Sequence, residues 1–577
     1  MTAPRPRPAP RPRRRQVLGA LGAAGLVGIG AACARIPSSS TVSVRPLGDQ
    51  AQGGAPYVQA VPPADGATPA QIVLGFVQAG VGPEDDYAVA REFLTSEASS
   101  SWDPGAGVTI YSGSQDLRAE PVDDTHVRLI AEAVDTVDVD GVRTTLAVPA
   151  MREITVELSQ DGDSWRIVDP PDGIFLSEAV FESLFAPGRL YFVDARARHL
   201  VPDHRWFSLF DGASGVLARL ADGPSDFLAG AVSSEVPDTE GIADARVTTG
   251  ADGGVQVTVP SAVGDLSDER RALALAQLEA SLRSLRTLSG VQLVWDGADL
   301  SATQEARIER ALPGHRPIAA GDTGVVSLAE ASATTALPQL VPSLSDRTVH
   351  APVIAQDGLL VAALSPEEKV VLVTATDGSV PLREAATGAG FVAPRIDDAG
   401  YVWTASRDSG GVLLALSGRA AEEDVKIDAP WLEGREVRAL DVAADATRLI
   451  VLSADATGTR LDLCAIVRDS SGAPSGLTDP RQVPTPLLGD LTRATWYDEI
   501  AVIVLGTDTS AEQVRGAVLD LATGRDLLPV FETAVKSLAG TAVAEAFWAG
   551  TVEGTLLRSD GEGWTDIGVR STDPAFY

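Results

Sequence analysis

Cys33 is the residue whose surroundings most clearly indicate a chemical reaction. It follows the small residues Gly30-Ala31-Ala32 and an apolar segment, Val17–Ile29, which a basic segment, Arg5–Arg15, precedes. A charged region, a short apolar region and a small-residue cleavage site in this order are typical of an export signal peptide. The apolar segment is too short to cross about 30 Å of hydrocarbon as a helix. We therefore expect residues 1–32 to be a cleaved signal peptide.

The residues around this cleavage site resemble a bacterial lipobox, although Gly30 stands where that motif prefers leucine. The resemblance implies that Cys33 becomes an N-palmitoyl, S-diacylglycerol cysteine and anchors the chain to a cell membrane. An ordinary secretory signal with a coincidental cysteine is the alternative, which the scarcity of cysteine in this chain disfavours. Arg14-Arg15 also resembles a twin-arginine export signal, so the export route stays open.

The second cysteine, Cys464, lies in the strand-like run Leu461–Val467. If Cys33 carries lipid, Cys464 has no partner for a disulfide within the chain. A cysteine in such a run is usually a small buried hydrophobic residue. We expect a free, buried thiol without a chemical role.

Other patterns that could support catalysis or metal binding lack their required context. His199 and His204 are five residues apart and so do not share a helical face, and no G-x-S-x-G sequence is present. The glycine-rich run Gly388–Ala393 has no apolar strand before it. The aspartates of Asp135–Asp140 lack the spacing of a calcium loop. We therefore expect no catalytic, cofactor-binding or metal-binding residues, and no enzyme activity.

The net charge narrows the choice of partners. The chain has 46 basic and 79 acidic residues, a net charge of −33. Because residues 1–32 hold six arginines and no acid, the mature chain has 40 basic and 79 acidic residues, or −39. Phosphates repel such a polyanion, so we expect neither nucleic-acid binding nor attraction to anionic lipid headgroups. The attachment to the membrane must then come from the lipid.

A chain of 577 residues is too long for one hydrophobic core, and we expect about three domains behind a tether. Residues 33–60 are rich in serine, glycine, proline and glutamine, which predicts a flexible tether. In residues 61–178, Thr68-Pro69 begins a predicted helix. Later segments alternate apolar and polar residues, as at Ile154, Val156 and Leu158, which predicts β-strands. Helices followed by antiparallel strands predict an α+β domain, for which nuclear-transport-factor-2-like domains are our loose analogy.

Residues 186–300 predict a second α+β domain. An apolar strand at Leu190–Val193 precedes a short helix at Ala213–Leu220, and Ser267 begins a long helix that Gly290 is expected to end. The remaining strands are predicted at 255–259 and 291–295. The predicted order is therefore strand, helix, strand, helix, strand.

The last 240 residues show a repeat. After a predicted linker, 301–337, pairs of apolar strands separated by polar turns recur at about forty residues within 338–577, in segments starting at Ser365, Asp397, Asp445, Asp498 and Ala544. This spacing is typical of the four-stranded blades of a β-propeller. A β-sandwich is the alternative, and the absence of any helical period over this region disfavours it.

The order of these parts resembles a known family. A lipobox with Cys33–Ser40, an α+β domain and a propeller are similar to the LpqB lipoproteins of actinobacteria. The middle domain resembles the GerMN module through Leu190–Val193, Leu217–Pro224, Val255–Val259 and Leu273–Leu293. The resemblance implies a position on the extracytoplasmic face of the membrane. It also implies binding to the extracytoplasmic domain of an MtrB-like sensor histidine kinase, with effects on MtrA, the cell envelope and division.

Two functions remain open from the sequence. The chain could be a lipid-anchored protein that binds and modulates the kinase, or a propeller-based cell-envelope hydrolase or carbohydrate-binding protein. For the first function we expect the GerMN-like domain to make the contact through Trp206 and Phe207, because aromatic side chains dominate binding hot spots. These residues follow the polar run Asp203–Arg205, so we expect one of the two rings to be exposed.

Overall fold

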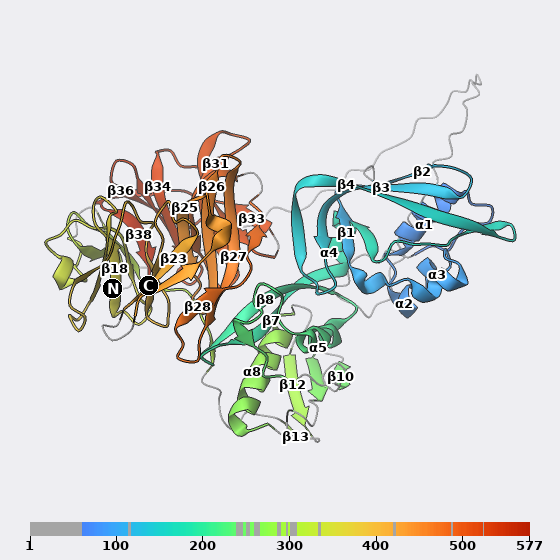
Figure 1. Cartoon of the computed structure of the whole chain (residues 1–577), viewed down its shortest axis with the longest axis horizontal. Coiled ribbons are helices and arrows are strands. Elements are labelled where there is room, and N and C mark those ends of the chain that lie inside the picture. Colours follow the sequence, from blue (N-terminus) through green and yellow to red (C-terminus); the bar gives the residue numbers. More distant parts are fainter. Residues whose placement is uncertain are drawn as a thin grey trace, which may run out of the picture. The chain divides into compact units, whose positions relative to one another are not determined.

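The computed structural model describes residues 60–577, except 114–116, 238–245, 250–253, 259–262, 264–265, 286–289, 296–297, 300–307, 333–335, 419–422, 486–487 and 523. The predicted signal peptide, the lipidation site Cys33 and the tether up to residue 59 lie outside these described residues. Figure 1 shows the N-terminal domain in blue to cyan, the middle domain in green and the strand-rich region in yellow to red.

The N-terminal domain packs helices against a sheet that is antiparallel except for the parallel pair β1 and β6. Its helices are α1 (Pro69–Ala79), α2 (Glu84–Arg91), α3 (Ser96–Ser101) and α4 (Glu178–Leu184), with a 3-10 turn η1 (Pro104–Ala106). Its strands are β1 (Val108–Tyr111), β2 (Leu117–Pro121), β3 (His126–Val137), β4 (Arg143–Asp161), β5 (Ser164–Ile167) and β6 (Ile174–Ser177). They follow the order β5-β4-β3-β1-β6, and β2 pairs with β3.

The predicted start of α1 is confirmed. The hydroxyl of Thr68 accepts from the Gln71 amide (3.4 Å), and the Gln71 side chain accepts from the Thr68 amide (2.8 Å), so two unpaired donors of the helix end are satisfied. The buried face of α1 holds Ile72, Val73, Phe76 and Val77. In β4, Val156 and Leu158 are buried and Ile154 packs partly buried against the same core, as the alternation predicts.

The middle domain contains two four-stranded sheets, β10-β11-β12-β13 and β14-β8-β7-β9. Its elements are β7 (Phe185–Asp194), β8 (His199–Ser208), α5 (Gly212–Asp222), β9 (Val232–Ser233), β10 (Arg246–Thr249), β11 (Gly254–Thr258), α8 (Asp268–Arg283), β12 (Gly290–Trp295), β13 (Ala298–Asp299) and β14 (Glu309–Arg310). Ser267 caps α8 as predicted. Gly290 does not end that helix but begins β12, because α8 ends at Arg283.

The strand-rich region is a β-propeller. One sheet holds β17 (His350–Ile354), β18 (Leu360–Leu364), β19 (Val370–Ala375) and β20 (Arg383–Thr387). The next holds β21 (Arg395–Ile396), β22 (Tyr401–Thr404), β23 (Val412–Ser417) and β24 (Val425–Asp428). The third holds β25 (Glu436–Val442), β26 (Arg448–Asp455), β27 (Gly458–Arg468) and β28 (Pro474–Leu477), with β29 (Arg481–Val483) beside β27. Two more hold β30 (Leu488–Trp496), β31 (Ala501–Asp508), β32 (Gln513–Asp520), β33 (Gly524–Leu527); and β34 (Val535–Thr541), β35 (Ala546–Thr551), β36 (Thr555–Ser559), β37 (Thr565–Arg570).

A further sheet closes the propeller, and two of its strands lie in the segment that we predicted to be a linker. It pairs β15 (Pro317–Ala320) with both β16 (Val325–Ser327) and β38 (Thr572–Phe576). The described residues therefore form six propeller sheets, and the first begins inside the segment 301–337 that we expected to be a linker. One edge strand of each sheet contacts those of its neighbours in a ring, in the order β17, β21, β25, β30, β34 and β38, and β38 returns to β17. These strands surround the central channel.

Candidate functional site

The expectation that Trp206 or Phe207 exposes a ring is wrong. Both lie on β8, which pairs with β7, and their exposed fractions are only 8% and 4%. The Trp206 ring packs against Phe181, with ring centroids 4.9 Å apart, and the Arg143 guanidinium lies 5.1 Å from its centroid. Both residues belong to cores, so neither offers a ring to a partner.

The exposed apolar side chains lie just after β8. Leu209 is 39% exposed and Phe210 is 49% exposed. Phe210 lines a groove of about 830 Å³ between the N-terminal and middle domains. The other aromatic residues that line this groove are Tyr87, Trp102, Phe185, Trp206 and Phe207. The exposed aromatic side chain that follows the predicted pair is therefore Phe210.

The charged groups at this groove are perturbed by burial. Burial raises the pKa of the Asp211 carboxyl above its ordinary value. Burial, with the nearby Asp211 and Asp86 carboxylates, raises the pKa of Tyr87 to about 12, so its hydroxyl keeps its proton at neutral pH. The groove therefore combines aromatic surface with a neutral hydroxyl donor, a combination that suits recognition of a protein surface.

Backbone contacts hold the two sides of the groove together. The Trp206 backbone amide donates to the Gly141 carbonyl (2.7 Å), and the Arg205 guanidinium donates to the Asp140 carbonyl (2.6 Å). Gly141 has φ +81°, and a Cβ atom there would lie 2.8 Å from the Trp206 carbonyl oxygen, so only glycine fits. The groove floor is thus built from both domains.

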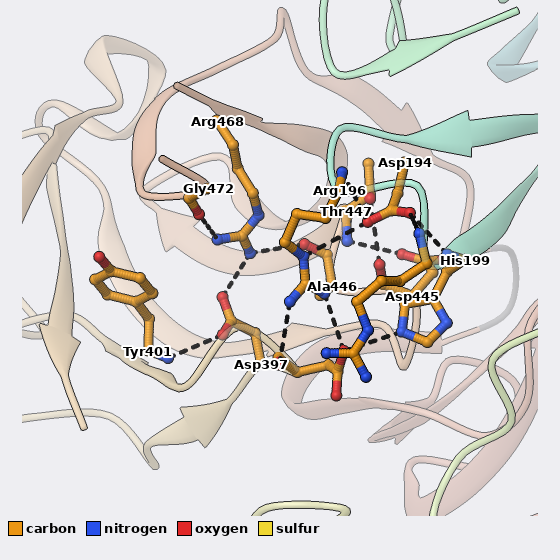
Figure 2. A network of polar contacts seen from close by, with 12 residues as sticks. Asp194, Arg196, His199, Asp397, Tyr401, Asp445, Ala446, Thr447, Arg468 and Gly472 are labelled. Atoms are coloured by element: carbon orange, nitrogen blue, oxygen red, sulfur yellow. Dashed lines mark hydrogen bonds and ion pairs between the residues drawn. The ribbon is translucent and has the colours of Figure 1, made fainter. Parts of the chain in front are cut away.

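A polar network joins the middle domain to the propeller (Figure 2). In the turn between β7 and β8, the Asp194 carboxylate accepts from the Arg198 and His199 amides, at 2.6 and 2.7 Å. This arrangement directs Arg196 and His199 toward the propeller, where each contacts the Asp398 carboxylate at 3.0 Å. The Arg198 guanidinium lies 3.6 Å from the same carboxylate, so the turn carries three cationic or protonatable groups onto one aspartate.

The next residue of the propeller, Asp397, organises the other half of the same network. Its carboxylate accepts from the Trp403 indole (2.8 Å), the Tyr401 amide (2.9 Å) and the Arg468 guanidinium (2.6 Å). Arg468 also donates to the carbonyls of Ala446 (2.8 Å) and Gly472 (3.1 Å), as Figure 2 shows. Asp397 and Arg468 are buried, so this pair connects neighbouring blades away from solvent.

A second buried carboxylate, Glu499, ties the middle domain to another blade. It accepts from Arg189, Arg310 and the Tyr191 hydroxyl, the last at 2.9 Å. These donors hold the pKa of Glu499 below its ordinary value, although burial alone would raise it. The middle domain thus rests on the propeller through charged contacts at two places.

Two of the histidines, His199 and His350, each face one carboxylate in the part of the chain that the structure describes. His199 pairs with Asp398, and His350 pairs with Asp573 at 3.1 Å, but no hydroxyl or thiol of a described residue bonds to either imidazole. The His204 side chain is buried. Within the same residues, no group of three or more histidine, cysteine, aspartate or glutamate side chains could hold a metal ion.

Three family models match successive parts of the chain. Residues 62–182 match the lipoprotein LpqB N-terminal domain, residues 189–301 match the Germane domain of sporulation and spore germination, and residues 324–576 match the lipoprotein LpqB β-propeller domain. The chain belongs to the LpqB lipoprotein family. The predicted order of an N-terminal α+β domain, a GerMN-like domain and a propeller is confirmed.

Curated relatives named lipoprotein LpqB match nearly the whole chain. The protein from Cutibacterium acnes is 27% identical over 512 residues, covering 82% of this chain and 84% of that protein. The Streptomyces coelicolor protein is 27% identical over 533 residues, covering 84% and 85%. The Rhodococcus opacus protein is 26% identical over 563 residues, covering 89% of each. Among the described residues of this LpqB-family chain, no helix has the length and apolar character to span a bilayer.

Cys464 is a free, buried thiol, as the sequence predicts. Its sulfur lies 3.7 Å from the Leu449 carbonyl oxygen, and burial raises the pKa of the thiol. Because thiolate is the reactive form, the folded protein should resist alkylation by iodoacetamide at pH 8 and react only when urea unfolds it. Mass spectrometry of the alkylated peptide measures this difference, and rapid labelling of the folded protein would contradict it.

His204 should make stability fall in mild acid. Burial, followed by the cations Arg448, Arg481 and Arg189, holds the pKa of His204 well below 6.5. Below pH 6.5 the unfolded chain binds a proton that the folded chain excludes, so the free energy of unfolding should fall by up to about 1.4 kcal/mol per pH unit. Urea unfolding at pH 7 and pH 5 measures the loss. His204→Gln should remove this part of the pH dependence, and an unchanged dependence would contradict the prediction.

Proposed function

We propose that the chain is a membrane-anchored extracytoplasmic lipoprotein that binds and modulates an MtrB-like sensor histidine kinase affecting cell envelope and division. The observation that carries the proposal is membership of the LpqB lipoprotein family across its N-terminal, Germane and propeller domains. The lipobox-like sequence ending at Cys33 supports attachment at the outer face of the membrane. A tether of about 27 residues has a root-mean-square reach of roughly 30 Å, which brings the folded domains within reach of a receptor's exported domain.

The groove around Phe210 is our choice for the kinase contact. It offers an exposed aromatic side chain beside an apolar neighbour, Leu209, and aromatic residues supply most hot spots of protein interfaces. The floor beneath it is fastened by Gly141 and Arg205, so little conformational freedom would be lost on binding. This assignment keeps the middle domain as the contact and moves it from Trp206 and Phe207 to Phe210.

The alternative, a propeller-based hydrolase or carbohydrate-binding protein, receives less support. Two cavities, of about 110 and 180 Å³, are lined by the strands that surround the propeller channel. In the larger one, the acidic lining residues are Glu368 and Asp573. Glu368 pairs with Arg407 at 2.8 Å and Asp573 pairs with His350 at 3.1 Å. A glycosidase needs two carboxyl groups facing one bond with separate acid and base roles, and these two already serve as ion-pair partners.

Binding of the full mature lipoprotein to the purified extracytoplasmic domain of the kinase tests the proposal. We expect saturable binding, and we expect Phe210→Ser to weaken it at least about tenfold because truncation of a central aromatic removes a hot spot. Val552→Ser is the matched control, because Val552 is 62% exposed on the propeller, and it should bind like the wild type. No binding by the wild type would overturn the function. Equal binding by Phe210→Ser would overturn only the assigned surface.

A further inference from the structure

The propeller channel of this acidic protein contains a cluster of cations. Four of them lie on or next to the channel-facing strands of successive sheets: Arg395 on β21, Arg438 on β25, Arg493 on β30 and Lys536 on β34. Together with Arg407 they line one cavity of about 180 Å³. We call these five residues the channel cations. A chain with 79 acidic and 46 basic residues has thus placed five of its cations around one small space.

The acids near this cavity neutralise only some of the channel cations. Glu368 pairs with Arg407 at 2.8 Å, and Asp441 pairs with Arg395 at 3.1 Å. Arg438 pairs with Asp490 at 2.6 Å and with Glu436 at 3.7 Å, and both carboxylates are exposed, so water screens these pairs. The remaining acid of the lining, Asp573, pairs with His350.

Arg493 and Lys536 are the two channel cations without such a partner. Neither forms an ion pair with any carboxylate that the structure describes, and the guanidinium of Arg493 donates to the backbone carbonyl of Thr492 (2.7 Å). Burial lowers the pKa of Arg493, and the neighbouring Arg407 and Arg395 add to this effect, whereas Asp573 and Glu368 oppose it. Arg493 is therefore partly desolvated near two other cations, and an entering anion would favour its charged form.

We propose that this cavity binds a phosphoryl group, either inorganic phosphate or the end of a phosphomonoester. A phosphate carries a charge of about −1.5 to −2 at pH 7, which complements the two lining cations that form no direct ion pair better than one carboxylate does. Guanidinium groups present paired N–H donors that fit its oxygens, and an ammonium adds a further donor. The cavity volume suits a group of this size rather than a long ligand. The proposal does not depend on the proposed binding to a kinase.

The test uses the full mature lipoprotein in detergent at pH 7.5, with sodium chloride added to hold the ionic strength constant. Inorganic phosphate, glycerol 3-phosphate and acetate are titrated separately by calorimetry, and the melting temperature is recorded with each. We expect saturable binding of one or both phosphoryl compounds and a rise in melting temperature of a few degrees, because a ligand that binds only the folded state stabilises it. Acetate should bind at least about tenfold more weakly.

Two double variants with the same change of charge locate the site. Arg493→Gln/Lys536→Gln should lower the affinity for phosphate at least about tenfold. Its melting temperature without ligand should be no lower than that of the wild type, because the variant removes mutual repulsion. Lys426→Gln/Arg570→Gln changes exposed cations on the outer strands β24 and β37 and should bind within about twofold of the wild type. No saturable binding of either phosphoryl compound, equal binding of acetate, or equal losses in the two variants would overturn the proposal.

Discussion

Cys33→Ala should abolish attachment of the protein to the membrane through lipid. The thiol of Cys33 is the predicted acylation site, and the mature chain carries −39 charges, so it gains no attraction from anionic headgroups. A diacylglycerol supplies two acyl chains, and stable anchoring requires about that much buried hydrocarbon. We expect the variant to lose all labelling by an alkyne-tagged fatty acid and to leave the membrane pellet, or to keep its uncleaved signal peptide.

Cys464→Ala is the matched control for this experiment. It removes the other cysteine of the chain, which is buried in the propeller and has no access to a lipid-transferring enzyme. This variant should keep full labelling and full membrane retention. Labelled, mature and membrane-bound protein in the Cys33→Ala variant would refute the lipobox interpretation, whereas loss of label in both variants would point to a general defect in export.

Local sequence patterns correctly predicted the helices and strands whose buried face is set by their own residues. The helix α1 begins where Thr68-Pro69 indicates it, and β4 buries Val156 and Leu158 through strict alternation. The predicted propeller strands correspond to the middle strands of the blades, such as β26 and β31, because these are continuous apolar runs. A strand that is buried on both faces can be recognised from its continuous apolar run, even when its partner strands are unknown.

The sequence failed where distant partners decide burial. Asp203, His204 and Arg205 form a polar run that suggested exposure, but all three are buried on β8. Asp203 and Arg205 pair with each other, and Ser225 donates to Asp203 at 2.8 Å. His204 lies among arginines from the propeller, more than 200 residues later in the chain. No local signal shows such a partner, so Trp206 and Phe207 were placed on the surface.

The channel cations were missed for a related reason. The channel-facing strand of each blade is short or mixed in composition, as in β21 (Arg395–Ile396), so the apolar pattern passes over it. The strands β15 and β16 were assigned to a linker because both are short and because β38, the other partner of β15, lies about 250 residues away. A signal exists in hindsight, since Arg395, Arg438, Arg493 and Lys536 occur one to a sheet in four successive sheets. Reading it requires knowing which strand of each blade faces the channel.

Asp397→Ala should destabilise the propeller more than any other single substitution considered above. The Asp397 side chain is fully buried, and the variant would leave Arg468 without its carboxylate and the Trp403 indole without its acceptor. Removing one partner of a buried ion pair typically costs about 3–5 kcal/mol. Urea unfolding followed by circular dichroism measures the shift in the transition midpoint, and we expect an unchanged slope.

Two comparisons distinguish this buried pair from a general effect of losing an aspartate. Asp398→Ala removes the neighbouring carboxylate, which is partly exposed and contacts Arg196 and His199 across the domain boundary, so it should cost about 1 kcal/mol. Asp397→Ala/Arg468→Met removes both buried charges and should regain most of the lost stability, because an apolar pair needs no neutralisation. If Asp397→Ala cost no more than Asp398→Ala, or if Arg468→Met gave no recovery, the buried pair would not be what joins these blades.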